Sequence, residues 1–194
     1  MVVVMRCSQR AQVSFVAAMG VIALAAVVGG QAITPLPQPP AGVSLERGRY
    51  LVTTVDCNGC HTPFKNGEPD MTRMLSGHPK AVKVTAKPPL PSGWDVAING
   101  TNTAWAGPWG ISFTTNLTPD RTTGIGNWTE QMFISTIRNG KRAGSGRPLL
   151  PPMPWRMYAR MSDDDLKSIF MYLKSIPAIA NRVPVAVVAP GPPK

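Results

Sequence analysis

The residues of this chain best suited to chemistry stand together in the run Cys57-Asn58-Gly59-Cys60-His61. Two thiols at this spacing can each form a thioether with one vinyl group of a single porphyrin, and a histidine directly after them completes the pattern of c-type haem attachment. The imidazole of His61 would then lie under the iron as the proximal ligand. We predict one covalently attached haem c, held by Cys57 and Cys60 and ligated by His61.

Three other interpretations of the cysteine pair fit the sequence less well. A thioredoxin-like pair requires a βαβ context, which the flanking pattern does not show. A zinc site needs two further ligands, whereas the chain has two histidines in all and its third cysteine is Cys7, ahead of a long apolar stretch. A disulfide across two residues would be strained and would leave His61 without a role. The haem interpretation accounts for all three residues.

The sixth iron ligand of an electron-transfer haem is usually a methionine or a histidine. Among ten methionines, Met153 is the preferred candidate because it lies in the segment Leu149–Trp155, where prolines stiffen the backbone around its thioether. Core packing is the default role of the other methionines. His78 is the alternative ligand, although a single histidine in a loop is more often a surface residue.

Three helices are predicted around these residues. The first begins after Ser44 as N-cap and leads directly into the cysteine motif. The second is marked by a capping box over residues 127–130 and ends at Gly140. The last begins after Ser162, where three aspartates favour the positive end of the helix dipole, and it ends before Pro177.

Residues 62–126 carry little helical periodicity and many prolines and glycines. A short hairpin between Val96–Ile98 and Ile111–Thr114 is the strand pairing predicted there. We therefore expect an all-α fold with a long loop-rich insert between the haem attachment site and Met153.

The N-terminal region has the features of an export signal. Arg6 and Arg10 precede a nearly continuous apolar run over residues 13–28, which is either a cleaved signal peptide or a short membrane anchor. Either alternative places the domain in the periplasm, or at the outer face of the inner membrane. The predicted organisation is a signal peptide or anchor (1–32), a Pro/Gly linker (33–43), a haem domain (44–180) and a Pro-rich extended tail (181–194).

The chain is strongly basic, with a formal net charge of +10. A basic surface favours acidic protein partners, anionic lipid or nucleic acid. No block of lysine and arginine is long enough to act as a nucleic-acid-binding arm. We therefore predict protein partners with acidic docking patches, no nucleic acid, and membrane association only through residues 13–28.

Several motifs together resemble one known family. They are Gly48-Arg49-Tyr50-Leu51, the cysteine motif, Asn116-Leu117-Thr118-Pro119-Asp120, residues 124–130, Pro152-Met153-Pro154-Trp155, residues 161–166 and Tyr172-Leu173. The chain is similar to bacterial class I cytochromes c, and most similar to the cytochrome c domains and subunits of membrane-associated dehydrogenases. The resemblance implies a class I cytochrome c fold in which the first and last helices cross near Gly48 and Tyr172.

The resemblance also implies that Cys57 and Cys60 attach haem, that His61 is the proximal ligand and that Met153 is the distal ligand. The expected function is single-electron transfer between redox proteins, such as a dehydrogenase, an oxidase or another carrier, rather than catalysis. A haem subunit of a membrane-bound dehydrogenase complex is the alternative, although such subunits often carry several haem motifs and this chain has one. The third possible function is that of a haem enzyme or sensor, in which the sixth coordination position of the iron is open.

Overall fold

The computed structural model describes residues 35–189, and the folded unit begins at Leu36. The predicted signal peptide or anchor, residues 1–32, lies outside the described residues. No helix within residues 35–189 is long and apolar enough to cross a membrane.

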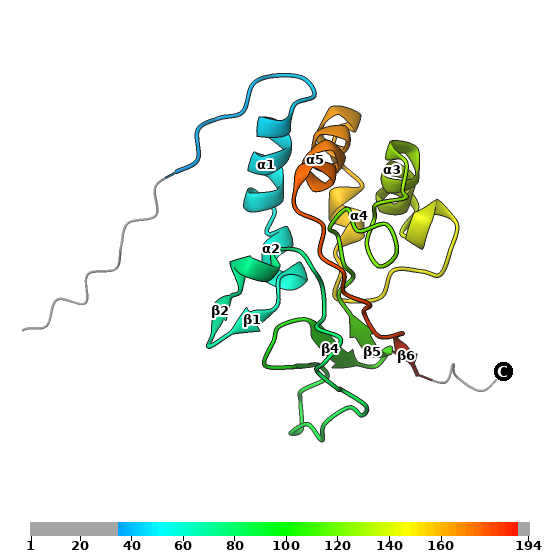
Figure 1. Ribbon diagram of the computed structural model, residues 1–194. Coiled ribbons are helices and arrows are strands. Elements are labelled where there is room, and N and C mark those ends of the chain that lie inside the picture. The colour runs from blue at the N-terminus through cyan, green and yellow to red at the C-terminus, as the bar shows by residue number, and fades with distance from the viewer. Residues whose placement is uncertain (1–34, 190–194) are drawn as a thin grey trace, which may run out of the picture. The chain divides into compact units, whose positions relative to one another are not determined.

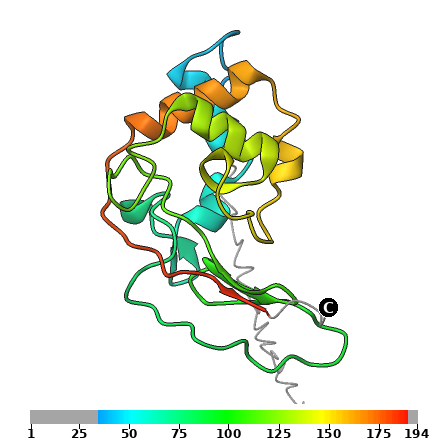
Figure 2. The same cartoon turned by 90° about the vertical axis from the view of Figure 1, so that its right-hand side faces the viewer.

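The described residues form short helices and short strands. The helices are α1 (Leu45–Thr54), α2 (Cys57–His61), α3 (Glu130–Asn139), α4 (Trp155–Tyr158) and α5 (Asp163–Ser175), with 3₁₀ turns η1 (Met71–Arg73) and η2 (Arg142–Gly144). The strands are β1 (Phe64–Lys65), β2 (Glu68–Pro69), β3 (Ala97–Ile98), β4 (Ala104–Gly107), β5 (Gly110–Phe113) and β6 (Val187–Val188). In the folded unit, α1, α5 and α3 gather at one end and the larger sheet lies at the other (Figures 1 and 2).

Helices α1 and α5 lie side by side and cross at Gly48, as the resemblance predicted. An ideal Cβ built on Gly48 would lie 2.0 Å from the carbonyl oxygen of Ser168 and 2.8 Å from the Cβ of Tyr172. The crossing is reinforced where Arg47 pairs with Asp165 at 2.7 Å. Glycine is required here because any side chain would separate the two helices that carry the ends of the domain.

Replacing Gly48 with alanine should therefore lower the free energy of unfolding by about 1–3 kcal/mol, the usual cost of overpacking. The loss should appear even though alanine is intrinsically the better helix former by about 1 kcal/mol. Denaturant titration of the purified protein measures the change. Gly100→Ala is the matched control, because a Cβ at Gly100 meets nothing within 4 Å; equal stabilities of the two variants would contradict the close crossing.

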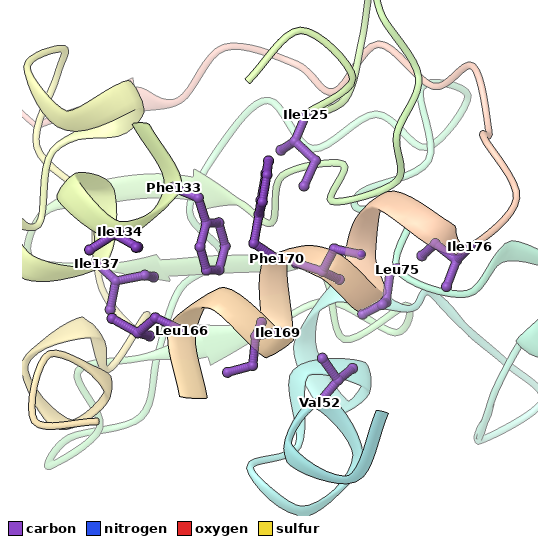
Figure 3. Close-up of a cluster of buried hydrophobic side chains, with 11 residues drawn as sticks. Val52, Leu75, Ile125, Phe133, Ile134, Ile137, Leu166, Ile169, Phe170 and Ile176 are labelled. Atoms are coloured by element: carbon purple, nitrogen blue, oxygen red, sulfur yellow. The ribbon is translucent and has the colours of Figure 1, made fainter. Parts of the chain in front are cut away.

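The main hydrophobic core lies between α1, α3 and α5. Figure 3 shows Val52 of α1 and Phe133 of α3 pointing toward the apolar face of α5. The rings of Phe133 and Phe170 stack with centroids 5.5 Å apart. This core arises from the helical periodicity of the sequence, in which each of the three helices has one apolar face.

The predicted helix ends at Ser44, Gly140 and Ser162 agree with the structure, and the predicted start of α3 differs. Ser162 and Asp165 form a reciprocal capping box at the start of α5, and Gly140 ends α3 with a positive φ of 63°. Helix α3 begins later than predicted, because Thr129 rather than Asn127 is the N-cap and accepts a hydrogen bond from the Met132 backbone.

The expectation of an all-α fold is wrong. The described residues contain a two-stranded antiparallel sheet and a four-stranded antiparallel sheet with the order β3-β4-β5-β6. In the larger sheet, Ala104 pairs with Phe113 and Ala106 with Ile111, and all four side chains are buried on one face. The insert therefore contains a second small core, built from alternating apolar residues rather than from helical stripes.

The predicted hairpin between Val96–Ile98 and Ile111–Thr114 is also wrong in its pairing. Strands form at both places, but β4 lies between β3 and β5. Strand β4 consists of Ala104–Gly107, and three of its four residues are alanine or glycine, which give too weak an alternating pattern to mark it in the sequence.

Residues from the C-terminal segment complete the sheet. Val187 of β6 pairs with Ile111 of β5, and Asn181 donates hydrogen bonds to the carbonyls of Ser76 and His78 at 2.7 and 2.9 Å. The side chain of Asn181 is only 1% exposed. These bonds hold the extended C-terminal segment against the insert.

Candidate haem-binding site

One cavity is lined by all four residues that the sequence singled out, namely Cys57, Cys60, His61 and Met153. Together with the open space at its mouth, the cavity measures about 1360 Å³. These four residues span almost a hundred positions of the chain, so the fold brings together groups that are distant in sequence.

The walls of the cavity come from almost every element of the helical half and from β5. They are predominantly apolar side chains and include core residues shared with Figure 3. The apolar members are Val55, Phe113, Leu117, Ile125, Trp128, Phe133, Ile137, Leu149, Leu150, Met161, Leu166, Ile169 and Leu173. Such walls suit a large, flat and mostly apolar ligand.

The cysteine motif forms α2 after a sharp turn out of α1. Asp56 adopts a left-handed conformation with φ 57°, and its carboxylate accepts a hydrogen bond from the Gly59 backbone at 2.9 Å. The Tyr158 hydroxyl donates to the carbonyl of Val55 at 3.0 Å. The turn is thereby fixed from both sides, and it directs both cysteines into the cavity lining.

The environment of the two thiols keeps them protonated. Burial, together with the charge of Asp56, raises the pKa of Cys57 to about 12, and the same causes raise the pKa of Cys60. Thioredoxin-like sites instead depend on a thiolate with a lowered pKa. These raised pKa values therefore do not favour dithiol redox chemistry at this pair.

His61 is held in the orientation that a metal ligand needs. Its Nδ1 donates a hydrogen bond to the carbonyl of Thr115 at 2.8 Å, which leaves Nε2 as the unprotonated nitrogen. Burial lowers the pKa of His61, so the imidazole is neutral. The segment over Gly77 and His78 connects the two sides of this contact, because the Gly77 amide donates to the carbonyl of His61 at 2.8 Å and the His78 amide donates to the carbonyl of Thr114 at 3.0 Å.

Met153 is half-buried in a loop that is fastened on two sides. The Ser112 hydroxyl donates to the carbonyl of Pro151 at 2.6 Å, and the Leu149 amide donates to the carbonyl of Gly140 at 2.8 Å. β5 and the end of α3 therefore both hold the loop from which Met153 lines the cavity.

His78, the alternative ligand, does not line the cavity. Its Nδ1 lies 2.9 Å from the Thr103 hydroxyl and its Nε2 lies 3.0 Å from the carbonyl of Val82. Its ring packs at a tilt against that of Phe113 with centroids 4.8 Å apart, and its side chain is fully buried. Both nitrogens already have partners, so His78 is a core residue of the insert.

The residues present fit a haem. Two sulfurs, a neutral imidazole and a thioether line one apolar cavity, and the buried Thr114 hydroxyl in the same lining has no hydrogen-bond partner among the described residues. Such an orphaned group is rare unless a ligand satisfies it. Sequence reasoning did not find Ser112, Thr114 or Thr115, since a backbone carbonyl or a lone hydroxyl leaves no residue-type signal.

Comparison with known proteins identifies relatives by sequence similarity. No family model matches the chain. It is 32% identical over 146 residues to the fructose dehydrogenase cytochrome subunit of Gluconobacter japonicus, 33% over 150 residues to the gluconate 2-dehydrogenase cytochrome c subunit of Pantoea cypripedii, and 31% over 143 residues to the alcohol dehydrogenase (quinone) cytochrome c subunit of Gluconobacter oxydans.

These alignments cover 75%, 77% and 72% of this chain, but only 24%, 27% and 23% of the relatives. The chain thus spans about a quarter of the length of the proteins that it matches. Over most of its length, this chain is therefore a homologue of the cytochrome subunits of fructose, gluconate and alcohol dehydrogenases.

Proposed function

We propose that this chain is an exported electron carrier that holds one haem c through Cys57 and Cys60, with His61 and Met153 as axial ligands. The observation that carries the proposal is the single apolar cavity lined by all four side chains. The relationship to cytochrome c subunits supports the same assignment. Mass spectrometry and absorption spectra of the exported protein test it: a colourless chain with the mass of the bare polypeptide would refute it.

The bound haem would supply a one-electron ferric–ferrous couple. The chain's own residues determine how that couple behaves. The carbonyl of Thr115 orients His61 and strengthens its basicity, the anchored loop holds the Met153 thioether in place, and the apolar walls exclude water. A thioether as the second axial ligand favours the reduced state and raises the potential.

If His61 and Met153 both bound the iron, no coordination position would remain for a substrate. The relatives are likewise named as cytochrome subunits. The role is therefore electron transfer rather than catalysis.

A haem subunit within a dehydrogenase complex is the second candidate, because that is how the relatives are named. The periplasm is the proposed location for both candidates, and residues 13–28 are the segment proposed to associate with the membrane. N-terminal sequencing of the native protein, and co-purification with a dehydrogenase, would distinguish a free carrier from an anchored subunit.

The docking surface for an acidic redox partner is proposed to lie around α4. Arg138 of α3 donates to the carbonyl of Ala159, which holds the ends of the two helices together. This brings the exposed cations Lys141 and Arg160 to the same region as Met157, whose side chain is 67% exposed. No acidic residue occurs between residues 131 and 162, and the neighbouring Asp163 is paired with Arg138 at 2.6 Å. An apolar centre with basic neighbours near the cavity is suited to a transient, electrostatically steered contact.

Reversing two of these charges, Lys141→Glu with Arg160→Glu, should slow electron transfer with a small acidic redox protein by roughly 10-fold or more at low ionic strength. The difference should shrink as salt screens the charges. Stopped-flow kinetics over a series of salt concentrations measures it. Lys65→Glu with Lys87→Glu is the control of equal charge change; equal slowing in both pairs would place the docking surface elsewhere.

A further inference from the structure

A short turn over residues 141–148 carries two arginines into the cavity lining. Arg142 and Arg147 both line the cavity, and the Arg142 amide donates to the carbonyl of Arg147 at 2.9 Å. Lys141 and Pro148 form an isolated bridge at the base of the turn. The backbone therefore holds the two guanidinium groups as neighbours.

Neither of these arginines has a carboxylate partner within the described residues. The ion pairs there are Arg47 with Asp165 and Arg138 with Asp163. The Arg147 guanidinium donates to the carbonyl of the adjacent Pro148 at 3.1 Å, and the Arg142 guanidinium lies 5.9 Å from the ring centre of Trp128. Burial and the neighbouring positive charge lower the pKa of Arg147.

Two adjacent cations at the edge of an apolar cavity repel each other, and an anion placed against both would relieve that repulsion. A haem has its vinyl groups at one edge and two carboxylate groups, the propionates, at another. Once the vinyl edge is bonded to α2, the carboxylates must be accommodated by another part of the same cavity. The described lining contains one acidic side chain, Asp56, which belongs to α2, and two basic side chains, which belong to this turn.

We propose that Arg142 and Arg147 form a clamp that binds the carboxylates of the haem propionates. The inference rests on the proposed function, since it requires the haem to be attached at α2. Planar guanidinium groups suit carboxylates because they offer several donors in a fixed fork. Their charge also favours the reduced haem, because an added electron is attracted to nearby cations.

The test uses the exported holoprotein with Arg142→Gln, Arg147→Gln and the double substitution. Arg49→Gln, on the exposed side of α1, is the matched control. The readouts are the midpoint potential and an NMR pH titration of the propionate groups. Each single variant should keep the attached haem and its sulfur–iron band, but lower the potential, and the double variant should lower it further. The propionate pKa should rise by about 1–3 pH units when a guanidinium is removed, with no change in the control.

Unchanged potentials and propionate pKa values in coloured single variants would overturn the clamp. If those variants instead only slowed electron transfer with an acidic protein, the arginines would bind carboxylates of the partner, and the clamp would again be wrong. Absence of attached haem in the wild-type protein would refute the proposed function itself, which is a separate outcome. Because both arginines have exposed side chains, the single variants are expected to fold.

Discussion

Replacing both Cys57 and Cys60 with serine is expected to give a chain without attached haem and without a cooperative native fold. Residues of the central core, including Phe133, Ile169 and Leu173, also line the cavity. Without the cofactor these side chains would border a large void or water, at a cost of several kcal/mol. A domain of this size has only about 5–15 kcal/mol of stability in total. Circular dichroism during thermal unfolding, with mass spectrometry, measures both effects.

The single variants Cys57→Ser and Cys60→Ser provide the controls. Each keeps one thioether, so each should remain coloured after denaturation, with a lower midpoint of unfolding than the wild type. The double variant should release any haem on denaturation. A double variant that stayed coloured after denaturation, or that unfolded like the wild type, would show that these cysteines are not the attachment points.

Replacing Met153 with alanine should abolish the sulfur-to-iron charge-transfer band of the ferric protein and lower the midpoint potential. The potential should fall because the thioether stabilises the ferrous state. The size of the fall should lie within the range of about 0.8 V over which axial ligands set haem midpoint potentials. The loop around Met153 is anchored by Ser112 and by the Gly140 carbonyl, so the backbone should remain in place. Absorption spectroscopy and redox titration measure the effect.

Met153→His extends this test, because it should restore a six-coordinate spectrum at a lower potential than the wild type. Met157→Ala is the matched control four residues away, since the Met157 side chain is 67% exposed. It should leave the band and the potential unchanged. If Met153→Ala retained the wild-type spectrum, Met153 would no longer be a ligand candidate.

Much of the candidate site was predictable because its chemistry is local. The cysteine motif places two sulfurs and an imidazole within five consecutive residues, so their shared role does not depend on the rest of the fold. The start of α5 was equally predictable, since Ser162 and Asp165 cap each other within one turn. The apolar stripes of the helices and the need for glycine at position 48 also follow from helical periodicity and the resemblance.

The insert and the surroundings of the site were decided by contacts that are distant in sequence. The partner of His61 is a backbone carbonyl 54 residues away, at Thr115, and any residue type can provide such an acceptor. Strand β4 lies between the two segments expected to pair, and β6 joins them from the end of the chain. His78 is buried as a core residue because Thr103 and Val82 satisfy its ring.

The difference between the features that were predictable from the sequence and those that were not has a physical cause. Cysteine motifs, caps and helical faces depend on residues within a few positions of each other, so the sequence alone determined the cysteine motif and the three longer helices α1, α3 and α5, whereas Met153 as a ligand stays a prediction. Sheet order, carbonyl acceptors and the environment of a buried histidine depend on which distant segments meet. Many sequences can satisfy those contacts, and only the tertiary structure decided them.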